Sequence, residues 1–63
     1  MTGAELRAHR RAAGMSQSAL AQRAEVSREA VRYWEAKPEV DPFGWAPRRI
    51  FVALGLGNIP AYN

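Results

Sequence analysis

Residues 17–36 constrain the fold of this chain most, because their pattern predicts two short helices joined by a tight corner. The first helix is expected over residues 17–24. The second is expected over residues 27–36, with the Ser27 hydroxyl as its N-terminal cap and Glu25 in the corner between the two.

The two faces of the helix expected over residues 27–36 differ in chemistry. At about 100° per residue, Ala30, Val31 and Trp34 fall on one arc, and Glu35 lies at its edge. The opposite arc carries Arg28, Glu29, Arg32, Tyr33 and Ala36. We expect the first arc to pack against the rest of the domain and the second to be free to bind a partner.

The flanking segments predict two further helices. Thr2 and Glu5 have capping-box spacing, and they precede a helix expected over residues 3–13. A last helix is expected over residues 47–54, because proline suits the first position of a helix and a glycine follows the end. Residues 37–42 contain two prolines and are expected to form a loop.

Length and charge limit the kinds of protein that this chain can be. With 63 residues it is expected to form one domain with a small core and short loops. The absence of cysteine excludes disulfides and fits a reducing cytosol, and no segment approaches the about 20 apolar residues of a membrane span. The net charge is +3, and eight of the nine basic residues are arginine, which favours a polyanionic partner.

Catalytic and metal-binding chemistry is not expected. His9 stands alone, without cysteine, aspartate or glutamate at ligand spacing, and no nucleophile is accompanied by a base and an orienting group. So short a chain also offers little room for an effector pocket. We therefore expect no enzyme activity, no metal, no cofactor and no small-molecule effector.

A set of residues stands in an order and at a spacing that are typical of one family. The set comprises Leu6-Arg7, Arg10, Arg11, Gly14-Met15-Ser16-Gln17, Leu20-Ala21, Ala24, Val26-Ser27, Val31, Trp34-Glu35 and Ala53-Leu54-Gly55-Leu56. Through it the chain resembles the lambda-repressor-like helix-turn-helix family, also called the Cro/repressor or XRE type. The resemblance implies a compact all-α fold of four to five helices, with the DNA-binding domain over residues 1–56 and the helix-turn-helix over residues 17–36.

The resemblance also implies roles for individual residues. The positions that face the major groove are those of Ser27, Arg28, Glu29, Arg32 and Tyr33. Gln17 and Ser18 match the start of the preceding helix, which meets phosphate and can brace a side chain of the recognition helix. Arg10 and Glu35 match an ion pair that ties the first helix to the third in phage repressors.

Two interpretations are open for several of these side chains. Arg28 and Arg32 lie one turn apart and can both fork onto guanine, or they form a solvated basic face paired with Glu29. Glu29 either accepts a hydrogen bond from cytosine or stabilises the helix N-terminus. Tyr33 either reaches sugar, phosphate or a thymine methyl group, or is a half-buried aromatic at the rim.

The remaining aromatic residues are expected to be structural. Trp34 lies on the inward arc and is assigned to the core. Phe43 and Trp45 are expected in the core or as loop anchors, whereas exposure of either one would indicate a partner surface. The family's usual fifth helix is not visible after Leu56, so residues 57–63 form a C-terminal tail that is a candidate dimer contact.

These observations predict a sequence-specific double-stranded DNA-binding regulator. The expected type is a small phage or mobile-element repressor or autorepressor, including antitoxin and anti-CRISPR-associated types. It would act in the cytoplasm, at the nucleoid, as a homodimer on a palindromic operator. The alternative is a protein-interaction module that uses the basic face of the third helix to dock an acidic protein.

Overall fold

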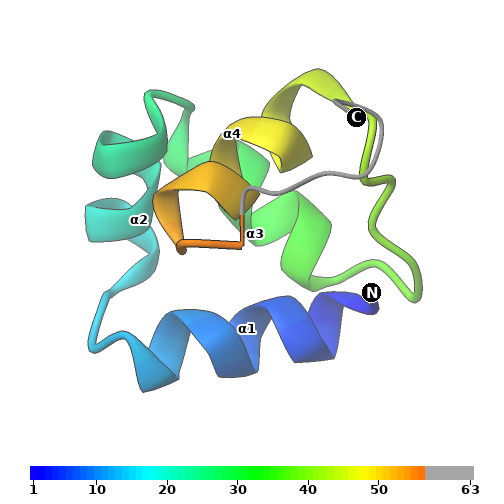
Figure 1. Ribbon diagram of the computed structural model, residues 1–63, viewed down its shortest axis with the longest axis horizontal. Helices are drawn as coiled ribbons and strands as arrows, with labels where there is room; N and C mark the ends of the chain where they lie inside the picture. Colours follow the sequence, from blue (N-terminus) through cyan, green and yellow to red (C-terminus); the bar gives the residue numbers. More distant parts are fainter. Residues whose placement is uncertain (57–63) are drawn as a thin grey trace.

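The computed structural model describes residues 1–56, and this part of the chain folds into four α-helices without a strand (Figure 1). The helices are α1 (Gly3–Ala12), α2 (Gln17–Ala24), α3 (Arg28–Glu35) and α4 (Trp45–Ala53). The predicted all-α fold is therefore confirmed. None of these helices is long and apolar enough to cross a bilayer. The tail of residues 57–63, which we assigned as a candidate dimer contact, lies outside the described residues.

Side-chain caps fix where the first three helices begin. The Glu5 backbone N–H donates to the Thr2 hydroxyl at 3.0 Å, and the Thr2 N–H donates to the Glu5 carboxylate at 2.8 Å, which completes the expected capping box. The hydrogen bond from Thr2 holds the pKa of the Glu5 carboxyl below its ordinary value. Ser16 and Ser27 cap α2 and α3 in the same way, each accepting one backbone N–H at 3.0 Å.

The start of α4 differs from the sequence prediction. The helix begins at Trp45 instead of Pro47, and Gly44 precedes it without a side-chain cap. Pro47 is accommodated in the third position because a backbone N–H in the first turn has no partner within the helix. The helix ends at Ala53, with Leu54 as its C-terminal cap.

The core lies where the four helices converge. Leu6, Leu20, Val31 and Ile50 contribute one buried side chain from each helix, and Val40 adds another from the α3–α4 loop. All five are fully buried. Of the inward arc predicted for α3, Val31 is buried in this core and the partly buried Trp34 packs against it, whereas Ala30 lies at the edge of the outward face.

Gly3 brings the start of α1 against the end of α3. Its backbone N–H donates to the Lys37 carbonyl at 2.9 Å. A Cβ atom at this position would overlap the carbonyl oxygens of Trp34, Glu35 and Lys37, which are backbone atoms that cannot yield. Only glycine permits this approach, a requirement that the sequence pattern alone did not reveal.

The corner between α2 and α3 is made by Glu25 in a left-handed conformation, with φ at 59°. A non-glycine residue there costs about 1–2 kcal/mol. Arg49 of α4 contacts this corner twice, because its Nε donates to the Ala24 carbonyl at 2.9 Å and its Nη2 pairs with the Glu25 carboxylate at 2.5 Å. A side chain distant in the sequence thus supports the strained turn.

Phe43 and Trp45 are not in the core, so that expectation was wrong. Their exposed fractions are 58% and 69%. For Trp45 the reason is the early start of α4, which turns Pro47, Ile50 and Phe51 toward the core and leaves Trp45 on the opposite side of the helix. The α3–α4 loop contributes Val40 to the core instead of an aromatic residue.

We expect Phe43→Ala to change the free energy of unfolding by less than about 0.5 kcal/mol, because the ring is mostly in water. Phe51→Ala is the matched control, since the same truncation at a buried site costs about 3–5 kcal/mol. Urea denaturation followed by circular dichroism measures both. A loss above about 2 kcal/mol for Phe43→Ala would show that the ring is packed.

Candidate nucleic-acid interface

The outward face of α3 presents the side chains that the sequence assigned to DNA. Arg28, Glu29, Arg32 and Tyr33 are all exposed, while Val31 between them is buried. Arg32 Nη1 lies 3.6 Å from the Glu29 carboxylate, and both side chains are mostly exposed. Such a pair contributes at most about 1 kcal/mol, so it is easily exchanged for a contact with a ligand.

The Tyr33 ring is held between two neighbours. Trp34 meets it edge to face, with ring centroids 5.1 Å apart, and the Lys37 ammonium lies 4.5 Å from its centroid. Lys37 had been assigned only to the loop after the helix. Its spacing of four residues from Tyr33 is the signal that could have placed it on this face.

Ser27 lies at the N-terminus of α3, where its hydroxyl oxygen accepts the Ala30 N–H. Because the hydroxyl is the acceptor in that bond, its proton remains available for a phosphate oxygen. Ser18 is exposed at the start of α2. The two serines therefore lie at the helix starts that a helix-turn-helix turns toward DNA.

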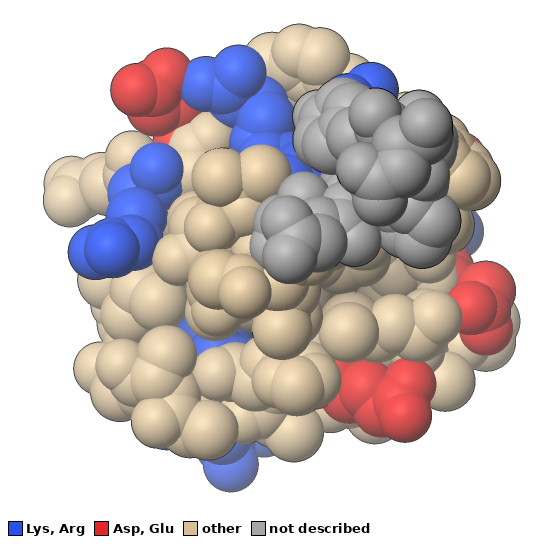
Figure 2. Space-filling model, in the orientation of Figure 1, with Lys and Arg blue, Asp and Glu red and all other residues tan. Residues whose placement is uncertain are grey.

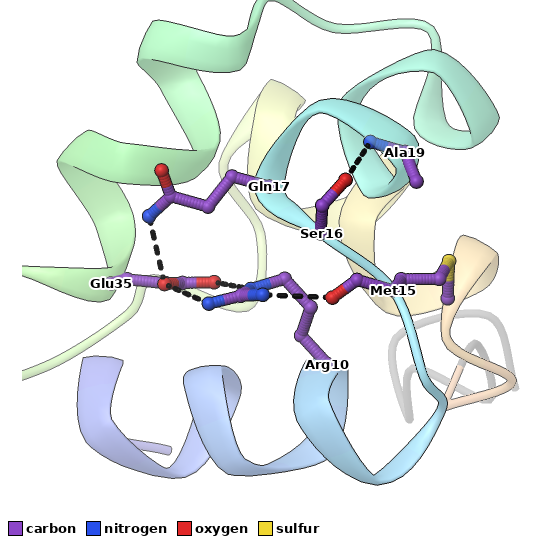
Figure 3. A network of polar contacts seen from close by, with 6 residues as sticks. All are labelled: Arg10, Met15, Ser16, Gln17, Ala19 and Glu35. Carbon is purple, nitrogen blue, oxygen red and sulfur yellow. Dashed lines mark hydrogen bonds and ion pairs between the residues drawn. The ribbon is translucent and has the colours of Figure 1, made fainter.

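A buried polar network holds α3 against α1 and α2 (Figure 3). Arg10 Nε donates to Glu35 Oε2 at 2.6 Å, and Arg10 Nη2 donates to Glu35 Oε1 at 3.3 Å. The exposed fractions of these two side chains are 9% and 5%. Arg10 Nη1 also donates to the Met15 carbonyl at 2.8 Å, and Gln17 Nε2 donates to Glu35 Oε1 at 3.1 Å.

This network sets the position of α3. Arg10 comes from α1, Gln17 from the first residue of α2 and Glu35 from the last residue of α3. In the described part of the chain, no buried side-chain nitrogen or oxygen lacks a partner. A fully satisfied buried network of this kind rigidifies the elements that it joins. Gln17 is therefore a positioning residue as well as a candidate phosphate contact.

We expect Ser27→Ala to lower the free energy of unfolding by about 1 kcal/mol, because the cap of α3 is lost. Ser18→Ala is the control, since an exposed serine without a capping role is expected to change it by less than about 0.5 kcal/mol. Thermal unfolding of both variants gives the comparison. Equal stability of the two would contradict the capping role.

A second exposed surface lies between the end of α2 and α4. Phe43, Trp45 and Val52 line a depression of about 770 Å³ there. In Figure 2, most visible lysine and arginine atoms lie toward the upper left, next to one acidic side chain, and further acidic atoms lie toward the right and lower right. The depression shares no lining residue with the outward face of α3, so the two surfaces are separate.

The helix arrangement and the outward basic face define the class of protein, an all-α domain built around a helix-turn-helix. The family model described as "Helix-turn-helix domain" matches residues 2–56, and the chain belongs to this family, which is found in XRE/Cro-type regulators. Searches of curated proteins and of solved structures gave no match. Family membership identifies the protein as a DNA-binding regulator.

Proposed function

We propose that this regulator is sequence-specific and represses transcription by occupying a double-stranded operator. The observation that carries the proposal is the exposed face of α3, where Arg28, Arg32 and Tyr33 project from a helix that buried ion pairing holds in place. Arginine forks onto the O6 and N7 atoms of guanine in the major groove, and a rigid helix gives that fork a fixed register.

Electrostatics supports the same partner. The net charge of +3 attracts the phosphate backbone, and this attraction weakens as salt rises. Ser18, in the first turn of α2, and Ser27, the N-terminal cap of α3, can donate to phosphate oxygens without carrying sequence information. Binding affinity would therefore come mainly from the backbone contacts, and sequence preference from α3.

We propose occupancy of the operator as the mode of repression. Occupying an operator needs only a DNA-binding surface, which the helix-turn-helix supplies. We further propose a homodimer on a palindrome, with the two α3 helices about 34 Å apart, one turn of DNA. We also propose that the protein is a repressor or autorepressor of the phage or mobile-element type, a type that includes antitoxin and anti-CRISPR-associated regulators.

Selection from a random pool of DNA duplexes tests the proposal. We expect enrichment of one motif with two half-sites whose centres are about 10 base pairs apart. That duplex, placed over a promoter, should then lower transcript yield when the protein is added. Recovery of unrelated duplexes after several rounds would contradict sequence-specific binding and would favour a domain that docks an acidic protein.

A further inference from the structure

The depression of about 770 Å³ between the end of α2 and α4 gathers three large apolar side chains at the surface. Phe43, Trp45 and Val52 all line it, and each is more than half exposed. Met1 and Tyr33 are the other exposed large apolar side chains among residues 1–56, and neither lines this depression. Single exposed apolar residues are ordinary, but a cluster of them is typical of a surface that binds a partner.

The Trp45 ring in this cluster is held by Arg49, whose Cζ lies 5.4 Å from the ring centroid. Arg49 is itself fixed by its bonds to the Ala24 carbonyl and the Glu25 carboxylate. A ring that is already ordered loses little conformational entropy when a partner covers it. Trp45 is therefore suited to anchor a bound partner.

The charges around the cluster indicate the sign of that partner. Arg23 of α2 and both Arg48 and Arg49 of α4 line the depression, together with Glu25 as its acidic residue, which gives these lining residues a net charge of +2. A second copy of the chain, related by a twofold axis, would bring the same arginines against one another. An acidic partner is complementary to them instead.

The length of α4 and the chemistry of the depression favour a helical partner segment. The 9 residues of α4 span about 13 Å, which is room for about two turns of a second helix. An amphipathic acidic helix offers an apolar stripe to the aromatic side chains and carboxylates to the arginines. The backbone of duplex DNA would supply the negative charge but no such stripe.

We propose that this α2–α4 face, formed by Arg23, Phe43, Trp45, Arg48 and Val52, is a docking surface for an acidic amphipathic helix of another protein. The inference goes beyond the proposed function and does not depend on it, because the face shares no lining residue with the outward face of α3. The partner helix and operator DNA should therefore bind the same molecule together.

Two synthetic peptides of matched sequence test the α2–α4 face. One is an amphipathic helix with leucine along one side and glutamate on the other, and its counterpart carries glutamine at every glutamate position. Calorimetric titration measures the affinity of each peptide. We expect the glutamate peptide to bind about tenfold tighter at low salt, the combined effect of a few exposed ion pairs, and this advantage to shrink as salt rises.

Substitution of the anchor assigns binding to this face. Trp45→Ala should weaken binding of the glutamate peptide by about tenfold, because a central aromatic side chain commonly dominates such an interface. Tyr33→Ala is the matched control, since it removes an exposed aromatic ring that lies on α3, outside the depression. Its affinity for the peptide should stay unchanged. Both rings are mostly in water, so both variants are expected to fold, and circular dichroism checks this.

Charge reversal assigns the preference for an acidic peptide. Arg23→Glu should bring the ratio of the two peptide affinities to about one, because the net charge of the lining residues falls to zero. Arg11→Glu changes the charge of the whole protein by the same amount but lies outside the depression, and it should retain the tenfold ratio. Both arginines are exposed and stand in the last turn of their helices, which matches the cost to the helix.

Several results would overturn the inference: no binding of the glutamate peptide, equal affinities for the two peptides at low salt, or full binding by Trp45→Ala. Self-association that requires Trp45 would assign the α2–α4 face to a second copy. Duplex or single-stranded DNA that displaces the peptide, and that itself requires Trp45, would assign it to nucleic acid. Failure to select any preferred duplex would overturn the proposed function but leave this inference standing.

Discussion

Replacing Arg10 with methionine is expected to lower the free energy of unfolding by about 3–5 kcal/mol. The substitution leaves the Glu35 carboxylate, 5% exposed, with Gln17 as its remaining side-chain donor. At about 0.05–0.15 kcal/mol per residue, the free energy of unfolding of a domain of this size is only a few kcal/mol in total. Much of the Arg10→Met protein should therefore be unfolded at 25 °C.

Urea denaturation of the Arg10→Met single variant and the Arg10→Met/Glu35→Leu double variant separates the loss of the ion pair from the cost of leaving Glu35 buried without its partner. In Arg10→Met/Glu35→Leu both charges are gone, so we expect most of the stability to return. A loss below about 1 kcal/mol for Arg10→Met would mean that the pair behaves as an exposed one. That result would contradict the role of the network in holding α3.

The second large effect is expected in DNA binding, where Arg32→Ala should cost about 1–3 kcal/mol on the selected operator. The side chain is exposed and only weakly paired with Glu29, so it can fork onto a guanine. Its loss should flatten the preference at one base pair and leave binding to random duplexes almost unchanged. If Arg32 met only phosphate, every sequence would weaken and the salt slope would fall by about one.

Gln17→Ala is the comparison, because Gln17 is uncharged and lies at the start of α2. We expect sequence-independent weakening without a change in salt slope. Loss of the hydrogen bond to Glu35, the bracing contact that the resemblance implied, should also lower the free energy of unfolding by about 1 kcal/mol. Both variants are titrated against the operator and its single-base variants at two salt concentrations. An equal loss for Arg32→Ala on every duplex would contradict its role as a base reader.

The fold could be predicted largely because its helix ends carry local signals. Thr2, Ser16 and Ser27 each cap a helix with their own hydroxyl, and a short side-chain cap acts on a backbone N–H only a few residues away. The start of α4 has no such signal, since Gly44 offers no side chain. That boundary, and with it the exposure of Trp45, was therefore predicted incorrectly.

The candidate site shows the same division between local and distant determinants. The outward position of Arg28 and Arg32 follows from helical periodicity alone. The contact of Arg49 with Glu25, and the approach of Gly3 to the end of α3, join residues more than twenty positions apart. No periodicity within a single helix encodes such contacts, so they emerge only from the packed structure.

The central claim is sequence-specific recognition of duplex DNA, and one titration tests it most directly. The affinity of the protein for the selected operator is compared with that for a duplex of the same length and composition in shuffled order, at physiological salt. The proposed function predicts binding to the operator that is at least about 10³-fold tighter, with both affinities falling as salt rises. Equal affinities for the two duplexes would contradict it.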